Sequence, residues 1–374
     1  MLKEKYNSTA PLRIGFIGAG RIVERVHLPI LNAMPEVVVV GLYDQDLRRA
    51  QTLASEFSIP KVCRSLDELF GLGADIAVVA CPNDLHAEMS VSALKANMHV
   101  LCEKPMATSV AGAKAMIEAA EHAGRELLIG STNRFRPDIE ALQKAIQEGK
   151  LGEIRTIRCG WLRRKGIPGI GTWFTSRAQA GGGVLTDLGS HMIDLAIWLG
   201  GRRRLISAQC ALDRFCSDLD QASWYKESIP AAQGAAVRRN LDVEITASGF
   251  AIFEGPLNVF IEVSWSSAVP HDQTYLHVMG SQGMARLETL FGLSPQGRRP
   301  ERPLQLWTDA SSEPHMIEGP VDALQPYRSE WKFFINSLMN GHSLRPWLSD
   351  GLAMMELIEA FYKSAQDIED ERSR

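Results

Sequence analysis

The strongest constraint on the fold comes from the first third of the chain, where short apolar runs alternate with helical patterns. The runs are "LRIGFIGAG", "EVVVVGLYD", "ADIAVVACP", "HVLCEKP" and "ELLIGST", and the helical patterns between them cover residues 22–34, 47–57, 88–96 and 109–123. Uninterrupted apolar runs are typical of strands buried on both faces, and the intervening helices are typical of parallel crossovers. We therefore predict a doubly wound α/β domain of the Rossmann type over residues 1–131.

From residue 132 onwards the pattern changes to alternating, strand-like segments separated by turn residues. Such a pattern predicts a second, α+β domain over residues 132–374, with an open, mostly antiparallel sheet that keeps one face exposed. We expect a helix over residues 185–199 to cover the other face, and amphipathic segments at 327–339 and 350–367 to close the structure. Residues 217–240 have no clear period and are expected to form a loop insertion.

Charge and cysteine usage exclude several classes of protein. The net charge is -4, the pI is about 6.2, and the basic runs at Arg202–Arg204 and Arg163–Lys165 are short, so we expect no nucleic-acid partner. No apolar segment is long enough to cross a bilayer, so no membrane partner is expected. The six cysteines lack metal-ligand spacing and lie mostly in apolar runs. We expect a cytoplasmic protein without a metal site.

The stretch "GFIGAGRIVERVHLP" has the form of a dinucleotide-binding turn between a strand and a helix. Glycines there let the backbone approach a pyrophosphate at the helix N-terminus. Val23 stands where the usual pattern has Gly or Ala. The second strand ends at Asp44, where an acid accepts hydrogen bonds from a ribose, and no arginine follows directly, so NAD is favoured over NADP. The predicted cofactor contacts of this region are Gly18, Gly20, Arg21, Ile22 and Asp44.

Two further strands end in polar residues at the edge where open α/β sheets bind ligands. "VVACPNDLH" ends one strand and "HVLCEKP" ends the next. His86 is expected either to face the cofactor or to cap the following helix, and a lone lysine after a strand, such as Lys104, is ordinarily solvent-exposed. The candidate cofactor contacts here are Cys81, Pro82, Asn83, His86, Glu103 and Lys104.

The octapeptide "DLGSHMID" follows a run of three glycines and places Asp187, His191 and Asp194 at helical positions i, i+4 and i+7. In a helix these three side chains share one face. Taken alone, the octapeptide favours a helix that begins with an acid and carries one hydrogen-bonded, half-buried histidine. The competing interpretation is a row of chemically active groups that lines a cleft.

The order of motifs resembles the Gfo/Idh/MocA family, which includes glucose-fructose oxidoreductase and inositol dehydrogenase. The resemblance runs from about Leu12 to Glu288 and rests on "GAGR", "CPNDLH", "CEKP", "NRFRPDI", "GTWFTSRAQAGGGVLTDLGSHMIDLAIWLGG" and "VMGSQGMARLE". It implies an N-terminal Rossmann domain, a C-terminal domain whose open sheet forms homodimers or homotetramers, and NAD(P)-dependent chemistry on one hydroxyl of a sugar, aminosugar or cyclitol.

The resemblance also implies that Lys104, Asp187 and His191 meet at the substrate carbon. A hydroxyl carbon releases hydride only when the hydroxyl proton leaves, and a neutral histidine accepts that proton near pH 7. His191 is thus the expected base, and Lys104 is expected to stabilise the developing alkoxide. Asp187 is expected to hold a neighbouring hydroxyl or to orient the other two side chains. Asp194 either orients the site or only stabilises its helix.

Four further sites are candidates, and all but Asn133 keep two interpretations. Asn133 is expected near the nicotinamide, and Arg134 either at the substrate or in an interdomain ion pair. Trp173 either stacks on a sugar ring or pins its loop. The run Arg163–Lys165 either binds a substrate anion or, as its surroundings favour, belongs to a solvated loop.

The expected activity is that of an NAD-dependent dehydrogenase or ketoreductase. Two alternatives remain: an NAD-dependent glycosidase that acts by transient oxidation, and a dinucleotide-binding sensor without turnover. Intact Lys104, Asp187 and His191 argue against a sensor, which needs neither a base nor an alkoxide stabiliser.

Overall fold

The computed structural model describes residues 10–215, 241–289, 291–292, 303–308 and 313–372. They fall into two compact units. The first unit comprises the chain up to Thr132 together with Leu324–Leu352, and the second comprises Asn133–Ala323 and Ala353–Arg374. The insertion expected at residues 217–240 lies outside the described residues. Within the described parts of the chain, no helix has the length and apolar content needed to span a bilayer.

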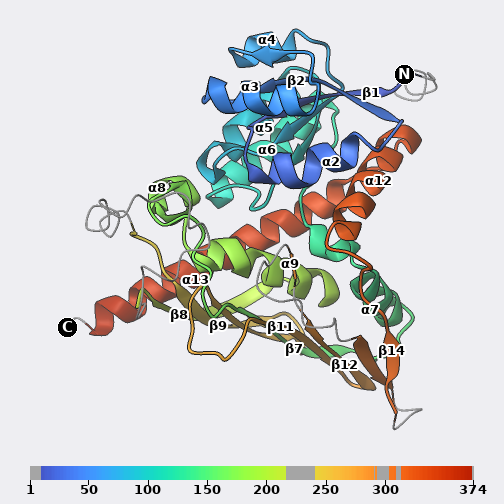
Figure 1. The fold of residues 1–374 in the computed structure, drawn as a ribbon. Helices are drawn as coiled ribbons and strands as arrows, with labels where there is room; N and C mark the ends of the chain where they lie inside the picture. Colours follow the sequence, from blue (N-terminus) through green and yellow to red (C-terminus); the bar gives the residue numbers. More distant parts are fainter. Residues whose placement is uncertain (1–9, 216–240, 290, 293–302, 309–312, 373–374) are drawn as a thin grey trace. The chain divides into compact units, whose positions relative to one another are not determined.

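The first unit is built on a six-stranded parallel sheet, which confirms the predicted Rossmann topology (Figure 1). The strand order β3-β2-β1-β4-β5-β6 places β1 beside β4, the point where the order reverses and where such sheets bind ligands. Its strands are β1 (Leu12–Ile17), β2 (Val37–Tyr43), β3 (Val62–Cys63), β4 (Ile76–Val79), β5 (His99–Cys102) and β6 (Leu127–Ile129). The short β3 and the helix after it were not predicted, because two strand residues carry no measurable period.

Helices cover both faces of this sheet. Ile14 and Phe16 of β1 point into an apolar core shared with α2, α3 and α12, whereas a Cβ placed on Gly15 would touch Leu69 of α4 on the opposite face. The helix predicted over residues 22–34 is shorter and begins with a π-helical turn, Val23–His27. The helices of the unit are α2 (Leu28–Leu31), α3 (Leu47–Glu56), α4 (Leu66–Phe70), α5 (His86–Lys95), α6 (Val110–Ala123) and α12 (Gln325–Asn340).

Helix α12 belongs to the first unit, although the sequence analysis assigned all residues after 131 to the second domain. Trp331, Phe334 and Leu338 of α12 lie in the core together with Phe16 and Leu28. Parallel sheets are covered on both faces, and the amphipathic α12 covers part of one face of this sheet. The periodicity of residues 327–339 predicts the helix but does not identify the surface on which it packs.

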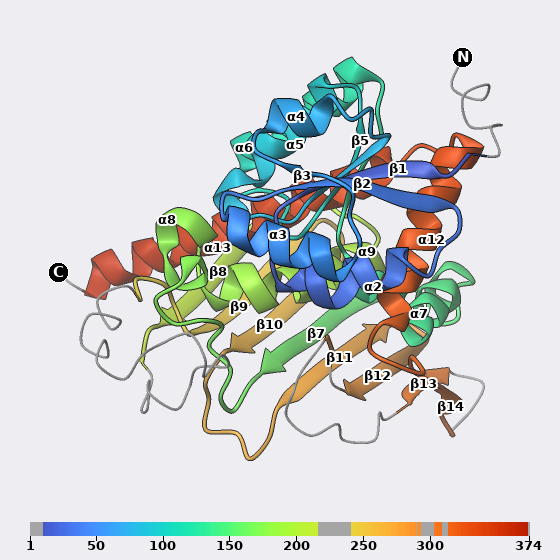
Figure 2. The ribbon, with the colours of Figure 1, turned by 45° about the horizontal axis from the view of Figure 1, so that its top comes forward.

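The second unit contains an eight-stranded mixed sheet, whose strands are seen lengthwise in Figure 2. Only β7 and β10 run parallel to each other; all other neighbouring pairs are antiparallel, as predicted for an open sheet. Helix α9 packs on the face formed by β7 and β10. The strands are β7 (Ile154–Leu162), β8 (Leu205–Asp213), β9 (Thr246–Phe253), β10 (Asn258–Ser264), β11 (Gln273–Gly280), β12 (Gly283–Thr289), β13 (Leu304–Thr308) and β14 (His315–Ile317). The α-helices are α7 (Pro137–Gln147), the short α8 (Arg177–Ala180), α9 (Ser190–Leu199) and α13 (Arg345–Arg372). Helix α13 continues from the first unit into the second.

The packing of α12 predicts a large stability difference between two truncations on the same helix. Phe334 is fully buried in the core of the first unit, whereas Met339 is 46% exposed. Phe334→Ala is expected to lower the free energy of unfolding by about 3–5 kcal/mol, because it leaves a cavity. Met339→Ala is expected to stay within about 0.5 kcal/mol of the wild type. Urea denaturation followed by tryptophan fluorescence measures both, and equal losses in the two variants would contradict the placement of α12.

Candidate active site

The turn after β1 has the geometry that a dinucleotide phosphate requires. Gly18 has φ +110°, and a Cβ at this position would lie 2.4 Å from the carbonyl oxygen of Ala80 at the end of β4. Only glycine therefore fits there. The turn leads into the helical segment that begins at Val23, and the backbone N–H groups of Val23 and Glu24 donate to Gly20 O at 3.0 and 3.1 Å. Arg21 at this turn is exposed and Ile22 is half-buried.

Asp44, directly after β2, is held against the same turn. Its Oδ2 accepts a hydrogen bond from the backbone N–H of Ala19 at 2.7 Å, and its Oδ1 accepts one from Asp46 N at 2.7 Å. A carboxylate fixed beside the glycine turn suits a ribose diol, since each oxygen accepts more than one hydrogen bond. The residues present thus fit a dinucleotide, and the structure brings Gly18, Gly20 and Asp44 together as the sequence predicts.

Residues at the ends of β4 and β5 continue the same edge of the sheet. Cys81 and Pro82 are half-buried, and Asn83 is buried in a short 3-10 turn. His86 is fully buried: its Nδ1 lies 2.7 Å from Pro105 O, and its Nε2 lies 3.0 Å from Cys81 O. A neutral imidazole carries one N–H, so His86 donates to one of these two carbonyls, and both edges of its ring lie against the backbone. The capping interpretation is wrong, because His86 is the first residue of α5 and no side chain caps this helix.

Lys104 follows β5 in the turn Glu103–Lys104–Pro105 and is partly exposed. Glu103 accepts a hydrogen bond from His27 Nε2 at 2.9 Å. Burial raises the pKa of the Glu103 carboxyl, but the hydrogen bond from His27 and the charge of Lys104 are among the causes that outweigh burial and lower that pKa below its ordinary value. Glu103 is therefore a carboxylate beside Lys104.

The second unit contributes Asp187 and His191. Every residue from Gly182 to Ile197 is buried except these two, which are partly exposed. Asp187 lies in a π-helical turn, Leu185–Gly189, and His191 lies at the start of α9. Local π-helical geometry is frequent at functional sites. An otherwise buried segment that exposes only an acid and a histidine matches the interpretation as an active face.

Two tryptophans that the sequence analysis did not single out hold these side chains. The indole Nε1 of Trp265 donates a hydrogen bond to Asp187 Oδ2 at 2.9 Å, and the ring of Trp161 lies 5.6 Å from the imidazole of His191. Trp161 is near the end of β7 and Trp265 directly follows β10. These are the two parallel strands of the sheet, so their carboxyl ends meet beneath the start of α9. Only the strand pairing reveals this, because the two tryptophans are far apart in the sequence.

Asp194 forms a buried ion pair with Arg134. The guanidinium donates to both carboxylate oxygens at 2.8 and 2.6 Å, and Arg134 is 1% exposed. The structure thus favours an ion pair over a substrate contact for Arg134, and the pair lies within the second unit. Bidentate geometry of this kind fixes α9 to the turn after β6. Asn133 lies in that same turn and is buried.

The remaining candidate residues are Trp173 and the basic run Arg163–Lys165. Trp173 stacks on the neighbouring Phe174, with ring centroids 3.8 Å apart, in a short 3-10 turn. Arg163 is 6% exposed and its guanidinium lies over the Trp161 ring, 5.5 Å from the centroid, so it is not part of a solvated loop. Arg164 is exposed, and its backbone N–H donates to Asp272 Oδ1 at 2.8 Å.

The glycine run before Asp187 is held by a buried acid, Glu244. Its carboxyl accepts hydrogen bonds from the backbone N–H groups of Gly183 and Leu185 at 3.0 Å and from the hydroxyl of Tyr362 at 2.8 Å. A Cβ on Gly183 would lie 2.0 Å from Glu244 O. Glycine at position 183 thus lets the segment that carries Asp187 approach the Glu244 backbone.

The glycine turn predicts a loss of stability for a substitution at Gly18 but not for the same substitution at Gly20. Gly18→Ala is expected to lower the free energy of unfolding by more than about 1 kcal/mol, because alanine meets both an unfavourable φ and the Ala80 carbonyl. Gly20→Ala is the control, because the atom nearest to its added Cβ is 3.8 Å away. Thermal denaturation without cofactor compares them. Equal melting temperatures of the two variants would argue against this turn geometry.

Burial of Glu244 predicts a pH dependence of stability. Burial raises the pKa of this carboxyl above its ordinary 4.5, although the hydrogen bonds from Tyr362, Leu185 and Gly183 lower it. The folded state then binds the proton more tightly than the unfolded state, so the associated stability is complete below the unfolded pKa and is lost as pH rises through the folded pKa. Glu244→Gln is expected to melt at a temperature that falls less than that of the wild type between about pH 5 and pH 8. Parallel melting curves across this range would contradict the assignment.

Two family models match most of the described chain. A model for the oxidoreductase family with an NAD-binding Rossmann fold matches residues 12–131, and a model for the GFO/IDH/MocA C-terminal domain matches residues 139–286. The first match coincides with the parallel sheet, and the second covers α7 and the strands up to β12. They confirm the predicted class of NAD-binding oxidoreductase.

Individual proteins give the same result over the whole chain. A protein of Amycolatopsis mediterranei strain S699 with the provisional name UDP-kanosamine synthase oxidoreductase subunit is 33% identical over 358 residues, 95% of this chain and 96% of its own. Glucose-6-phosphate 3-dehydrogenase of Bacillus subtilis strain 168 is 28% identical over 94% of this chain and 95% of its own. The solved structure of levoglucosan dehydrogenase with NADH and levoglucosan shares the fold, with a TM-score of 0.78 at 19% identity over 96% of this chain and 98% of that one. The glycine turn with Asp44, the exposed pair on the buried helix and these full-length matches together establish that the chain belongs to the Gfo/Idh/MocA family of oxidoreductases.

Proposed function

We propose that the protein is an NAD-dependent dehydrogenase or ketoreductase acting on one ring hydroxyl of a sugar or aminosugar. The observation that carries the proposal is the exposure of Asp187 and His191 alone on the buried segment from Gly182 to Ile197. One full-length relative is named for UDP-kanosamine synthesis and the other as a 3-dehydrogenase of glucose 6-phosphate. A cyclitol is a further candidate substrate because it offers the same ring hydroxyls.

The proposed chemistry divides the work among three side chains. His191 accepts the hydroxyl proton, since a histidine changes its charge near neutral pH. Lys104 donates a hydrogen bond to the same oxygen and stabilises the alkoxide that develops on it. Asp187, held in one orientation by Trp265, accepts a hydrogen bond from a neighbouring hydroxyl and so fixes the ring. Bound NAD supplies the hydride acceptor.

For the cofactor we propose NAD rather than NADP. Gly18, Gly20, Arg21 and Ile22 would hold the pyrophosphate, and Asp44 the adenosine ribose. Asp44 lies within two residues of Asp46, so a 2'-phosphate would approach two carboxylates. Cys81, Pro82, Asn83 and Asn133 are proposed to line the nicotinamide side, together with Glu103 and Lys104.

We also propose that copies of the chain associate through the outer face of the eight-stranded sheet. Ile252 of β9 and Phe260 of β10 are 36% and 40% exposed there, and Phe250, Phe260 and Tyr275 line an open hollow of about 470 Å³. Exposed apolar surface of this kind is typical of interfaces. A homodimer or homotetramer would cover it.

The test is absorbance of reduced cofactor when the protein is mixed with NAD or NADP and glucose, glucose 6-phosphate, a UDP-sugar, aminosugars, inositols and glycosides. We expect NAD to be reduced with at least one sugar. Lys104→Ala and His191→Ala are each expected to lower kcat/KM by about 100-fold or more, because each removes a group that acts on the reacting oxygen.

Lys114→Ala and His122→Ala are the matched controls, since both side chains are exposed on α6. Product formation from a glycoside without net change in NAD would favour the glycosidase. Dinucleotide binding with no turnover of any compound would favour the sensor. Full activity of His191→Ala would contradict the proposed base.

A further inference from the structure

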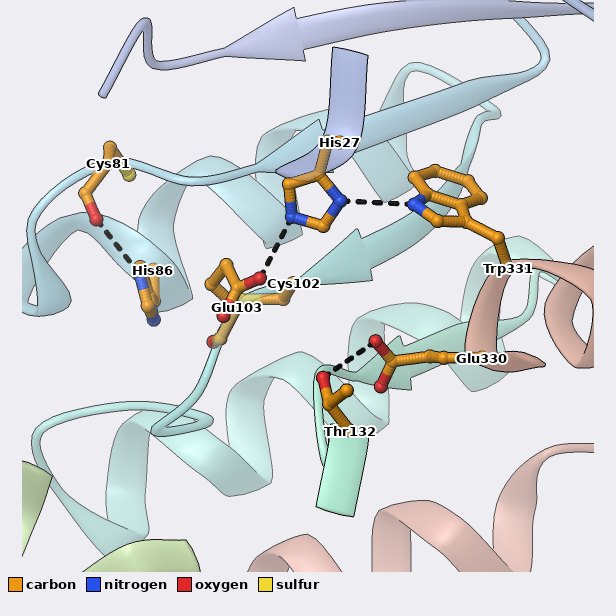
Figure 3. A network of polar contacts seen from close by, with 8 residues as sticks. All are labelled: His27, Cys81, His86, Cys102, Glu103, Thr132, Glu330 and Trp331. Atoms are coloured by element: carbon orange, nitrogen blue, oxygen red, sulfur yellow. Dashed lines mark hydrogen bonds and ion pairs between the residues drawn. The ribbon is translucent and has the colours of Figure 1, made fainter. Parts of the chain in front are cut away.

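The proposed function leaves unexplained a buried chain of polar groups in the first unit (Figure 3). The indole Nε1 of Trp331 on α12 donates a hydrogen bond to His27 Nδ1 at 3.0 Å, and His27 Nε2 lies 2.9 Å from Glu103 Oε1. Trp331 and His27 are both 0% exposed, and the Glu103 side chain is 14% exposed. We call these three residues the Trp331–His27–Glu103 chain.

The hydrogen-bonding capacity of these three side chains fixes which atom donates and which atom accepts at each contact. An indole N–H only donates, so His27 Nδ1 must accept and carries no proton. The ring proton is therefore on Nε2, which donates to the Glu103 carboxylate. Trp331 thus selects the tautomer of His27 that Glu103 needs, in the way that a partner on one ring nitrogen sets the role of the other.

Glu103 in turn holds the turn that carries Lys104. The Glu103 backbone N–H donates to Val79 O of β4 at 2.9 Å, and its side chain lies against Gly130, where an added Cβ would be 3.4 Å from Oε2. Beyond Lys104, the carbonyl of Pro105 contacts His86 Nδ1 at 2.7 Å. The residues on both sides of Lys104 are therefore fixed by buried histidines, and neither histidine belongs to the proposed chemistry.

We propose that His27 and Trp331 are positioning residues that set the placement of Lys104 through Glu103. This inference rests on the proposed function, in which Lys104 acts on the substrate oxygen. Burying hydrogen-bonding groups costs free energy, which their mutual hydrogen bonds only offset. Three apolar side chains of the same shape would cover the sheet equally well, so packing alone does not require these three polar residues. Their arrangement from α12 to the residue before Lys104 matches a role in orienting the site, where small displacements have large effects on rate.

Three variants and one control separate positioning from simple packing. Trp331→Phe removes the donor to His27 and keeps an aromatic ring. His27→Gln places an amide N–H2 near the position of Nε2 and keeps the donor to Glu103, whereas His27→Asn places its oxygen near Nδ1 and loses that donor. Trp347→Phe is the matched control: it is the same exchange in the same unit, at a ring that contacts Phe333 instead of His27.

Steady-state kinetics give the first readout. His27→Asn and Trp331→Phe are expected to lower kcat by about 10- to 100-fold, with the KM for NAD changed by less than about threefold, because the reacting lysine is displaced while the dinucleotide turn is intact. His27→Gln and Trp347→Phe are expected to stay within about threefold of the wild-type kcat. Equal kcat values for His27→Gln and His27→Asn, or for Trp331→Phe and Trp347→Phe, would overturn the proposal.

A second readout does not depend on turnover. Lysines are reductively methylated with a carbon-13 label, and the Lys104 resonance is assigned by its loss in Lys104→Arg. We expect its chemical shift to change in Trp331→Phe and His27→Asn and to stay unchanged in Trp347→Phe. If the wild type converts no sugar, the proposed function fails, while this resonance still decides the positioning role: an unmoved signal in Trp331→Phe rejects it.

Discussion

Both faces of a parallel sheet must be kept from water, and the rest of this protein depends on how that requirement is met. One face of the six-stranded sheet is covered in part by α12, which follows the strands of the second unit in the chain. The first unit is therefore completed only after Asn133–Ala323 of the second unit has been synthesised. The same helix brings Trp331 to His27, so the element that closes the core also reaches the edge where Lys104 lies.

The active face of the second unit follows a different physical logic. From Gly182 to Ile197 the segment is buried, and a buried polar group is costly unless it is hydrogen-bonded. Asp194 meets that condition through Arg134, and the backbone N–H groups of the glycine run meet it through Glu244. Asp187 is bonded by an indole N–H but stays partly exposed, as does His191. Within this segment, the buried polar side chain Asp194 stabilises the structure, whereas the partly exposed Asp187 and His191 are accessible for chemistry.

Sequence patterns predicted the parts of the fold whose signals are local. The apolar runs located β1, β2, β4, β5 and β6, and Gly18 with Asp44 identified the dinucleotide turn, because tight turns and buried strands restrict nearby residues strongly. They missed β3 and β14, which are too short to show a period. His86 and Arg134 were both given a possible role toward ligands, but each is buried and bonded to groups that the sequence does not place beside it.

By itself, the sequence determined the Rossmann topology, the open mostly antiparallel sheet, the family and the identity of Lys104, Asp187 and His191 as the residues to test. Periodicity and motif spacing act within a few tens of residues, which is why these inferences were possible. The tertiary structure alone decided that Trp161 and Trp265 flank the active helix, that Asp194 belongs to Arg134, and that α12 joins the first unit. Each of these contacts connects residues whose separation along the chain carries no pattern, and only the pairing of strands and the burial of apolar faces bring them together.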